Sequence, residues 1–256
     1  MQLTVLNSGS TGNGYVLQNG TEALVLECGV PRQDCLAALG YSTAKVQGCL
    51  LTHEHGDHAH YIEDYLPLMS VYCSRGTAEA VESARTNSAR ANLGSSLRKP
   101  TVLVPLRTVS IGGFRVRPIP AEHDAAEPFA YIIDHEDIGR LLFATDTYYL
   151  RYRIPDLTSL MIECNYSLPL LNANVAAGLI PAALKNRTLE SHMSIEHLRE
   201  MLAANDLTHV TQIVLIHLSA RNSDPQAFCR EIIRQTGKPT TYAHKGLTIE
   251  LNKTPF

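Results

Sequence analysis

Short apolar runs alternate with longer amphipathic stretches along the whole chain. The short runs, rich in Val, Ile and Leu, predict β-strands at 3–6, 15–17, 23–27, 47–51, 71–73, 102–104, 114–119, 129–133, 141–145, 160–163, 212–216, 240–242 and 247–251. The longer stretches predict helices at 31–39, 58–66, 76–85, 194–204 and 224–235. This alternation predicts an α/β fold. Because no low-complexity linker or repeat divides the chain, we expect one domain over residues 1–256.

Composition narrows the class of protein and its compartment. The chain is 45% hydrophobic and 18% charged, which excludes disorder, a collagen-like repeat and a coiled coil. The N-terminal segment has neither the basic nor the apolar part of a signal peptide, and no apolar stretch approaches the roughly 18 residues of a membrane span. The six cysteines are scattered without a Cys-x-x-Cys pair, which favours buried reduced thiols over disulfides. We therefore expect a cytoplasmic protein with no membrane partner.

Charge is distributed unevenly. The 22 basic and 25 acidic residues give a formal net charge of −3, so no overall basic field indicates a nucleic-acid or membrane partner. Between residues 75 and 117, however, there are eight basic residues and only two acidic ones, Glu79 and Glu82, so this segment has a formal charge of +6. This segment is either a solvated face or a groove for phosphates, and a neighbouring metal site favours the groove. The eight are Arg75, Arg85, Arg90, Arg98, Lys99, Arg107, Arg115 and Arg117.

The most specific motif is His53-Glu-His55-Gly-Asp57-His58, which comes directly after an apolar run. In extended backbone, residues two apart face the same side, so His53 and His55 can face one metal ion. Gly56 lets the chain turn, and Asp57 and His58 then lie at the mouth of the next helix, able to hold a second ion. The motif therefore predicts a metal site.

Three further metal-ligand types follow predicted strands elsewhere in the chain. His123, Asp146 and His217 each come at the end of an apolar run. Each position is weak by itself, since a lone His or Asp at a strand end is often structural. Together they indicate a shared site, because α/β sheets build their sites at the carboxyl ends of strands.

The complete pattern resembles the metallo-β-lactamase-fold hydrolases. The resemblance implies an α/β architecture described as an αββα sandwich, with two mixed β-sheets flanked by helices. It also implies two divalent metal ions, one bound by His53, His55 and His123 and the other by Asp57, His58 and His217, with Asp146 bridging both.

Further segments narrow the resemblance to the YycJ-type branch, described as single-domain bacterial exonucleases. They are Ser8-Gly-Ser-Thr-Gly-Asn13, Glu163-Cys-Asn165-Tyr, Ser191-His192-Met-Ser194 and His217-Leu-Ser219-Ala-Arg-Asn222. One position departs from the family pattern. Where the family usually has an Asp that braces the His-rich loop, this chain has Glu27, whose longer side chain can accept the same hydrogen bonds.

The ligand types suggest a reaction. His and carboxylate ligands suit zinc, manganese or iron. Two such ions with Asp57, Asp146 and a bridging hydroxide leave a charge of about +1, which suits an anionic phosphodiester. The lactamases of this fold usually carry Cys where this chain has Asp146, so β-lactam hydrolysis is disfavoured. We therefore predict a nuclease of the 5′–3′ exonuclease kind that uses the metal-bridging hydroxide as nucleophile.

We expect Asp57 and His192 to be the catalytic residues. His192 resembles the non-ligand histidine of phosphodiesterases in this superfamily, which protonates the leaving oxygen. Alternatively, His192 caps the helix that begins near Ser194.

Four residues are candidate substrate contacts. Asn13 lies in a glycine-rich turn whose N–H groups can converge on a phosphate, although the same turn can simply join two strands. Ser219, Arg221 and Asn222 directly follow the expected ligand His217, and Arg221 can hold a phosphate through two hydrogen bonds.

The expected partner is nucleic acid or another phosphodiester substrate, and two other functions stay open. The first is a small-molecule hydrolase acting on cyclic or small phosphodiesters, or on thioesters as in glyoxalase II. The second is a non-catalytic nucleic-acid-binding module, which the complete ligand set disfavours. The sequence predicts no oligomeric state.

Overall fold

The computed structural model describes residues 1–86 and 98–254, which form two compact units. The first unit comprises Met1–Pro120, Ala125–Tyr131 and His244–Glu250. The second comprises Ala121–Asp124, Ile132–Ala243 and Leu251–Phe256. Each unit therefore joins segments that are far apart in the sequence. The expectation of one domain over the whole chain stays a prediction.

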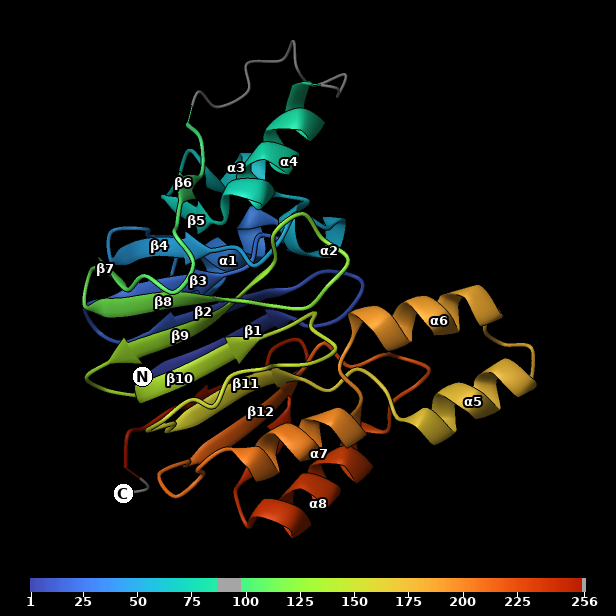
Figure 1. Cartoon of the computed structure of the whole chain (residues 1–256). Helices are drawn as coiled ribbons and strands as arrows, with labels where there is room; N and C mark the ends of the chain where they lie inside the picture. The colour runs from blue at the N-terminus through green and yellow to red at the C-terminus, as the bar shows by residue number, and fades with distance from the viewer. Residues whose placement is uncertain (87–97, 255–256) are drawn as a thin grey trace. The chain divides into compact units, whose positions relative to one another are not determined.

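The first unit contains a seven-stranded sheet in the order β14-β1-β2-β3-β4-β5-β6 (Figure 1). Strands β14, β1, β2 and β3 pair antiparallel, whereas β3, β4, β5 and β6 pair parallel. The strands are β1 (Gln2–Asn7), β2 (Gly14–Gln18), β3 (Ala23–Leu26), β4 (Val46–Leu50), β5 (Val71–Cys73), β6 (Thr101–Val102) and β14 (Thr248–Glu250). The helices are α1 (Arg32–Ala38), α2 (Gly56–Ala59), α3 (Ile62–Tyr65) and α4 (Arg75–Thr86), and β7 (Val109–Ile111) and β8 (Phe114–Pro120) form a hairpin.

The central strands of this sheet are largely apolar. Every residue of β3 is buried, and so are the last three of β4. Such continuous burial is expected of parallel strands covered on both faces. A cluster of apolar side chains from these strands and from α1, α3 and α4 forms a core of the unit. The His-rich motif lies between β4, a strand of this core, and α2.

The second unit is built on the parallel strands β10 (Gly139–Ala144), β11 (Ser159–Glu163), β12 (Gln212–Ile216) and β13 (Thr240–Tyr242). They belong to a second seven-stranded sheet, in the order β13-β12-β11-β10-β9-β8-β7, with β9 spanning Phe129–His135. The helices are α5 (Leu168–Ala176), α6 (Ala182–Ser191), α7 (Ile195–Ala204) and α8 (Pro225–Thr236). The prediction of two mixed sheets with flanking helices is confirmed.

Helix starts in the second unit follow local sequence. Ser167, Ser194 and Asp224 each accept a hydrogen bond from a backbone N–H of the first turn. Ser194 and Asp224 were expected to start helices, whereas α5 and α6 were not predicted, nor was strand β7. In the first unit, the single helix expected at 58–66 is two short helices, α2 and α3.

The cysteines provide a first testable prediction. All six are free and buried, as the sequence predicts. Burial raises the pKa of Cys35 and Cys73 to about 12 and that of Cys229 to about 11, so the reactive thiolate is scarce at neutral pH. We expect the folded chain to react with a thiol reagent such as dithionitrobenzoate far more slowly than the chain in denaturant, where all six thiols react. Rapid labelling of several thiols without denaturant contradicts this burial.

No helix in the described part of the chain is both long and apolar enough to cross a membrane.

Candidate metal centre

The His-rich motif follows β4 directly and leads into α2. His53 is buried, and its Nδ1 lies 2.9 Å from the hydroxyl of Thr52. The imidazole of His53 lies 4.7 Å from that of His55 and 4.3 Å from that of His58, between ring centroids. Asp57 and His58 occupy the first turn of α2, as expected, so the motif gathers three imidazoles and one carboxylate around a strand end.

Glu27 braces this loop from the neighbouring strand. It is fully buried and directly follows β3, with a left-handed backbone at φ 70°. Its Oε2 accepts a hydrogen bond from Thr52 N at 3.5 Å and lies 3.4 Å from His58 Nδ1. Glutamate therefore contacts the ligand loop from the place where the family usually has aspartate. A carboxylate that contacts one ring nitrogen of a histidine sets which other nitrogen is available to a metal.

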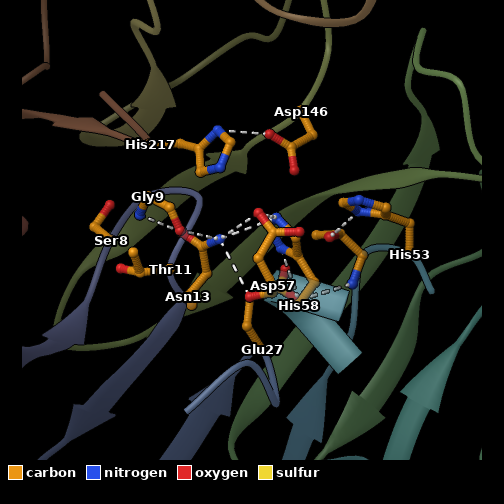
Figure 2. A network of polar contacts seen from close by, with 12 residues as sticks. Ser8, Gly9, Thr11, Asn13, Glu27, His53, Asp57, His58, Asp146 and His217 are labelled. Atoms are coloured by element: carbon orange, nitrogen blue, oxygen red, sulfur yellow. Dashed lines mark hydrogen bonds and ion pairs between the residues drawn. The ribbon is translucent and has the colours of Figure 1, made fainter. Parts of the chain in front are cut away.

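Asn13 lies beneath the same loop rather than on the surface. Its side chain is fully buried; its Oδ1 accepts a hydrogen bond from Gly9 N at 2.8 Å, and its Nδ2 lies 3.0 Å from His58 Nε2. Figure 2 shows this amide between the turn and the residues Asp57 and His58. The backbone N–H of Asn13 donates to Asp57 O at 2.7 Å. Because these groups already bind one another, the contacts favour the strand-joining turn, and substrate contact by Asn13 stays a prediction.

In the second unit, Asp146 and His217 lie just beyond the ends of β10 and β12. His217 Nδ1 lies 2.7 Å from Asp146 Oδ1, a contact drawn in Figure 2. Both residues have left-handed backbones, with φ of 49° and 52°. Left-handed backbone is uncommon for residues other than glycine, and it clusters at functional sites, where packing holds it in place. These two expected ligands are thus brought together by strand ends separated only by β11.

Glu163, at the end of β11, connects these residues and was not assigned a role from the sequence. It is fully buried; its Oε1 lies 2.9 Å from His217 Nδ1 and 2.8 Å from His192 Nδ1. Its Oε2 accepts hydrogen bonds from Thr147 N at 3.0 Å and Met193 N at 3.1 Å. The sequence marks Glu163 as an acid at a strand end within the family segment Glu163-Cys-Asn165-Tyr, but it does not show these contacts, because the partners lie 16 to 54 residues away.

His192 ends α6, so it does not cap the next helix; Ser194 does. Burial lowers its pKa, but the negative charge of Glu163 and hydrogen bonds to Asp146 and Glu163 outweigh burial and raise the pKa to about 9. In the metal-free chain His192 is therefore protonated at neutral pH. Its ring lies 5.3 Å from that of His217 and 5.5 Å from that of His123. The geometry suits a group that gives up a proton beside the ligands.

His123 is oriented by its backbone neighbours in the second unit. Its Nδ1 lies 2.7 Å from the carbonyl oxygen of Ser191, to which it is placed to donate. The preceding Glu122 is tied to the segment after β10, since Glu122 N donates to Thr147 Oγ1 at 2.9 Å and Glu122 O accepts from Tyr148 N at 3.1 Å. Burial lowers the pKa of His123, which favours the neutral, ligand form.

The three candidate substrate residues after His217 lie in one loop of the second unit. Ser219 N donates to Asn165 O at 2.9 Å. Asn222 is buried, and its Oδ1 accepts from Asn174 Nδ2 of α5 at 2.8 Å. The exposed Arg221 donates to Leu179 O at 3.3 Å. This loop is thus fastened to the α5–α6 pair, and contact of its residues with substrate stays a prediction.

The donors present fit divalent metal ions. In the second unit, Asp146, Glu163, His192 and His217 each offer one ligand atom, all within 4.8 Å of one another. In the first unit, Nδ1 of His53 contacts the hydroxyl of Thr52, and Nδ1 of His58 contacts the carboxylate of Glu27. Such outer partners fix the ring of a metal-binding histidine. Imidazole and carboxylate donors together suit zinc, manganese or iron.

We expect Glu163→Gln to lower the pKa of His192 from about 9 toward its ordinary value, because the largest favourable charge is removed. An NMR titration of the imidazole in chelator-treated protein measures this shift. Turnover of phosphodiesters with poor leaving groups should also fall by about 10- to 100-fold, the usual cost of losing an outer partner. Glu196→Gln is the control, since Glu196 accepts only from Leu168 N in the same unit. An unchanged titration of His192 contradicts the contact.

Comparison with known proteins identifies the family. The sequence profile of the β-lactamase superfamily domain matches residues 32–218, which include all of the expected ligands. The chain belongs to this family. The solved structure of YhfI from Bacillus subtilis, a metallo-β-lactamase fold protein, is similar over 97% of this chain and 98% of that one, with a TM-score of 0.71 and 16% identity. Human tRNase Z, short form, is similar over 98% and 99%, with a TM-score of 0.65 and 15% identity. At such identities these two similarities show the fold alone.

Curated relatives are more similar in sequence. Exodeoxyribonuclease WalJ of Streptococcus pneumoniae is 26% identical over 231 residues, which cover 86% of this chain and 82% of the relative. Exodeoxyribonuclease YycJ of Bacillus anthracis is 26% identical over 235 residues, covering 87% and 84%. The expected family is therefore confirmed, and these two relatives carry the names of the expected exonuclease branch.

Proposed function

We propose that the chain is a metal-dependent hydrolase that cleaves phosphodiester bonds of DNA, as an exonuclease. The observation that carries this proposal is the buried contact of Asp146 with His217, with Glu163 and His192 beside it. This arrangement joins expected metal ligands to a proton-carrying histidine. The names of the curated relatives support DNA as the substrate, and we infer 5′–3′ polarity from the same branch.

We propose two divalent ions, zinc first among them, as the cofactors. The ligand assignment implied by the family resemblance is supported by the donor set found in each unit: His53, His55 and His123 for one ion, Asp57, His58 and His217 for the other, with Asp146 shared. When bound, such ions supply an activated water and offset the charge on phosphoryl oxygens.

The chain's own residues handle the leaving group and its proton. His192 is one-fifth exposed, so its ring reaches solvent while its Nδ1 is held at 2.8 Å by Glu163. With Nδ1 occupied, Nε2 is the atom that donates a proton to the departing sugar oxygen. Glu163 keeps the ring in this orientation and favours its charged form.

Turnover of two small esters tests the reaction class. We expect the protein, supplied with zinc, manganese or iron, to hydrolyse bis(p-nitrophenyl) phosphate much faster than a glutathione thioester. Thioester turnover without diester turnover would make the chain a small-molecule thioesterase. Absence of diester turnover with all three metals would overturn the proposal.

We also propose that the protein works in the cytoplasm. Six buried free cysteines support this, since reducing compartments keep thiols reduced.

A further inference from the structure

Two exposed arginines share one face of β8 in the first unit. The strand alternates, with Phe114 and Val116 buried and Arg115 and Arg117 exposed, so both guanidinium groups lie on its outer face. Residues two apart on a strand are separated by about 7 Å. Opposite Arg115 on the paired strand β7 lies the exposed Ser110, which adds a hydroxyl to the same face.

A third arginine is held close to this strand. Leu106 N donates to Pro118 O at 2.8 Å, which fastens the preceding loop to β8. The next residue, Arg107, is exposed. Because its neighbour Leu106 is bonded to Pro118, the residue after Arg117, the backbone of Arg107 lies near that of Arg117. We call Arg107, Arg115 and Arg117 the β8 arginine strip; β7 and β8, which frame it, are seen as a hairpin in Figure 1.

The strip carries positive charge without local compensation. Residues 98–120 hold five basic and no acidic residues. Among the described residues, no carboxylate forms an ion pair with any arginine of the strip. Exposed arginines elsewhere do have such partners: Arg199 binds Glu231 at 2.8 Å, and Arg187 binds Asp124 at 2.8 Å.

The rest of the basic segment is organised differently. Arg85 binds Glu63 at 2.6 Å and Glu82 at 3.0 Å, and Lys99 lies 3.4 Å from Glu82, so their charge is partly offset. Arg90 lies outside the described residues. Arg75, at the start of α4, also has no ion pair among the described residues, but it stands alone, so the grouped uncompensated charge of the segment lies in the strip.

Protection of a sheet edge does not account for the strip. Charged residues often guard edge strands against aggregation, but here β7 is the edge and β8 is the next strand inward. Like charges side by side are mutually unfavourable, so three such arginines favour an anion that binds them together. The repeated spacing along a strand suits a repeated charge, as in a polynucleotide backbone.

We propose that the β8 arginine strip binds phosphates of the DNA strand several nucleotides from the bond that is cut. This inference rests on the proposed nuclease function. Arg117 is six positions before the expected ligand His123, so their Cα atoms lie at most about 20 Å apart. A polynucleotide offers the strip further phosphates along the same strand, whereas a small ester offers none beyond the one that is cut.

The test compares Arg115→Gln/Arg117→Gln with wild type. We expect at least about a 10-fold weaker binding of single-stranded DNA of about 20 nucleotides, measured by fluorescence anisotropy. The salt slope should be smaller by about 1.4, since each lost phosphate contact with a single strand removes about 0.7. kcat/KM for this DNA should fall in parallel. Turnover of bis(p-nitrophenyl) phosphate should stay within about twofold, because this ester carries no further phosphate for the strip to bind.

Arg230→Gln/Arg234→Gln is the matched control, since it removes two exposed arginines from α8 and the same net charge. Equal loss of DNA binding in the two double variants overturns the proposal, because net charge alone then explains the effect. The proposal is also overturned if Arg115→Gln/Arg117→Gln loses binding to anionic phosphatidylglycerol vesicles but binds DNA as wild type does.

The strip and the nuclease function fail in different ways. If wild type binds DNA through the strip but cleaves neither DNA nor the small diester, the nuclease function fails and the strip stands. If both substrates are cleaved and the strip variant binds DNA as wild type does, the strip fails and the nuclease function stands.

Discussion

Replacing Asp146 with Asn should reduce phosphodiester turnover by more than about 100-fold, the upper end of what loss of a mere outer partner costs at a metal site. Asp146 offers its carboxylate to His217 at 2.7 Å and to His192 at 3.3 Å. Asparagine keeps the shape and tolerates the left-handed backbone at φ 49°, so the change removes charge and little else. Initial rates on bis(p-nitrophenyl) phosphate and the bound metal per chain are the measurements.

Asp156→Asn is the matched control for this variant. Asp156 also has a left-handed backbone, at φ 58°, but its side chain is 82% exposed and forms an ion pair with Arg140, at 3.9 Å, rather than with an expected ligand. Turnover should stay within about twofold of wild type, since surface substitutions seldom matter. Near-normal turnover by Asp146→Asn, with normal metal content, contradicts a role for Asp146 as a shared ligand.

Gly29→Ala should destabilise the first unit and lower the amount of metal bound at the His-rich motif. A Cβ on Gly29 would lie 1.8 Å from Asp57 O and 2.6 Å from Asn13 N, both backbone atoms that cannot rotate away. Three segments meet there through backbone hydrogen bonds, among them Asn13 N to Asp57 O and Gly29 N to Asn13 O. Overpacking of this kind costs about 2–3 kcal/mol, which in a chain of this size lowers Tm by roughly 5–10 °C. Metal content should fall as well, because Asp57 and His58 must move.

Gly56→Ala is the informative comparison, since Gly56 lies inside the His-rich motif. A Cβ there meets nothing within 4 Å, and the backbone is not left-handed. The stability of this variant should match that of wild type to within about 0.5 kcal/mol. The sequence suggested that Gly56 is needed for the sharp turn; the structure instead places the requirement for glycine at Gly29. If both variants unfold at the same temperature, the packing at Gly29 is not as described.

Strands and the metal motif were predictable because their signals are local. β3 is a continuous apolar run, β4 and β11 are largely apolar, and the His-rich motif begins three residues after β4. Asp146 and His217 were found from the same logic of strand ends. The family profile then confirms the fold that these patterns implied.

The parts that were not predicted lack a local signal. In α5, Leu-Pro-Leu-Leu-Asn-Ala-Asn-Val-Ala, apolar residues have no single face, so no helical stripe appears; only Ser167 followed by Pro169 indicates a helix start. Glu163 is an acid in a buried strand end, but its contacts with His192 and His217 are long-range. Likewise, the sequence shows that Glu27 departs from the family pattern, but the left-handed backbone that brings it within 3.4 Å of His58 is a tertiary effect.

The most direct test measures bound metal and DNA hydrolysis in the same preparation. The protein is assayed on 5′-labelled single-stranded and double-stranded DNA and on RNA as purified, after chelation, and after zinc or manganese is restored. We expect hydrolysis of DNA to disappear on chelation and to return as the metal content rises to about two ions per chain. Undiminished DNA hydrolysis by the metal-free chain, or intact DNA with both ions bound, would contradict a metal-dependent nuclease.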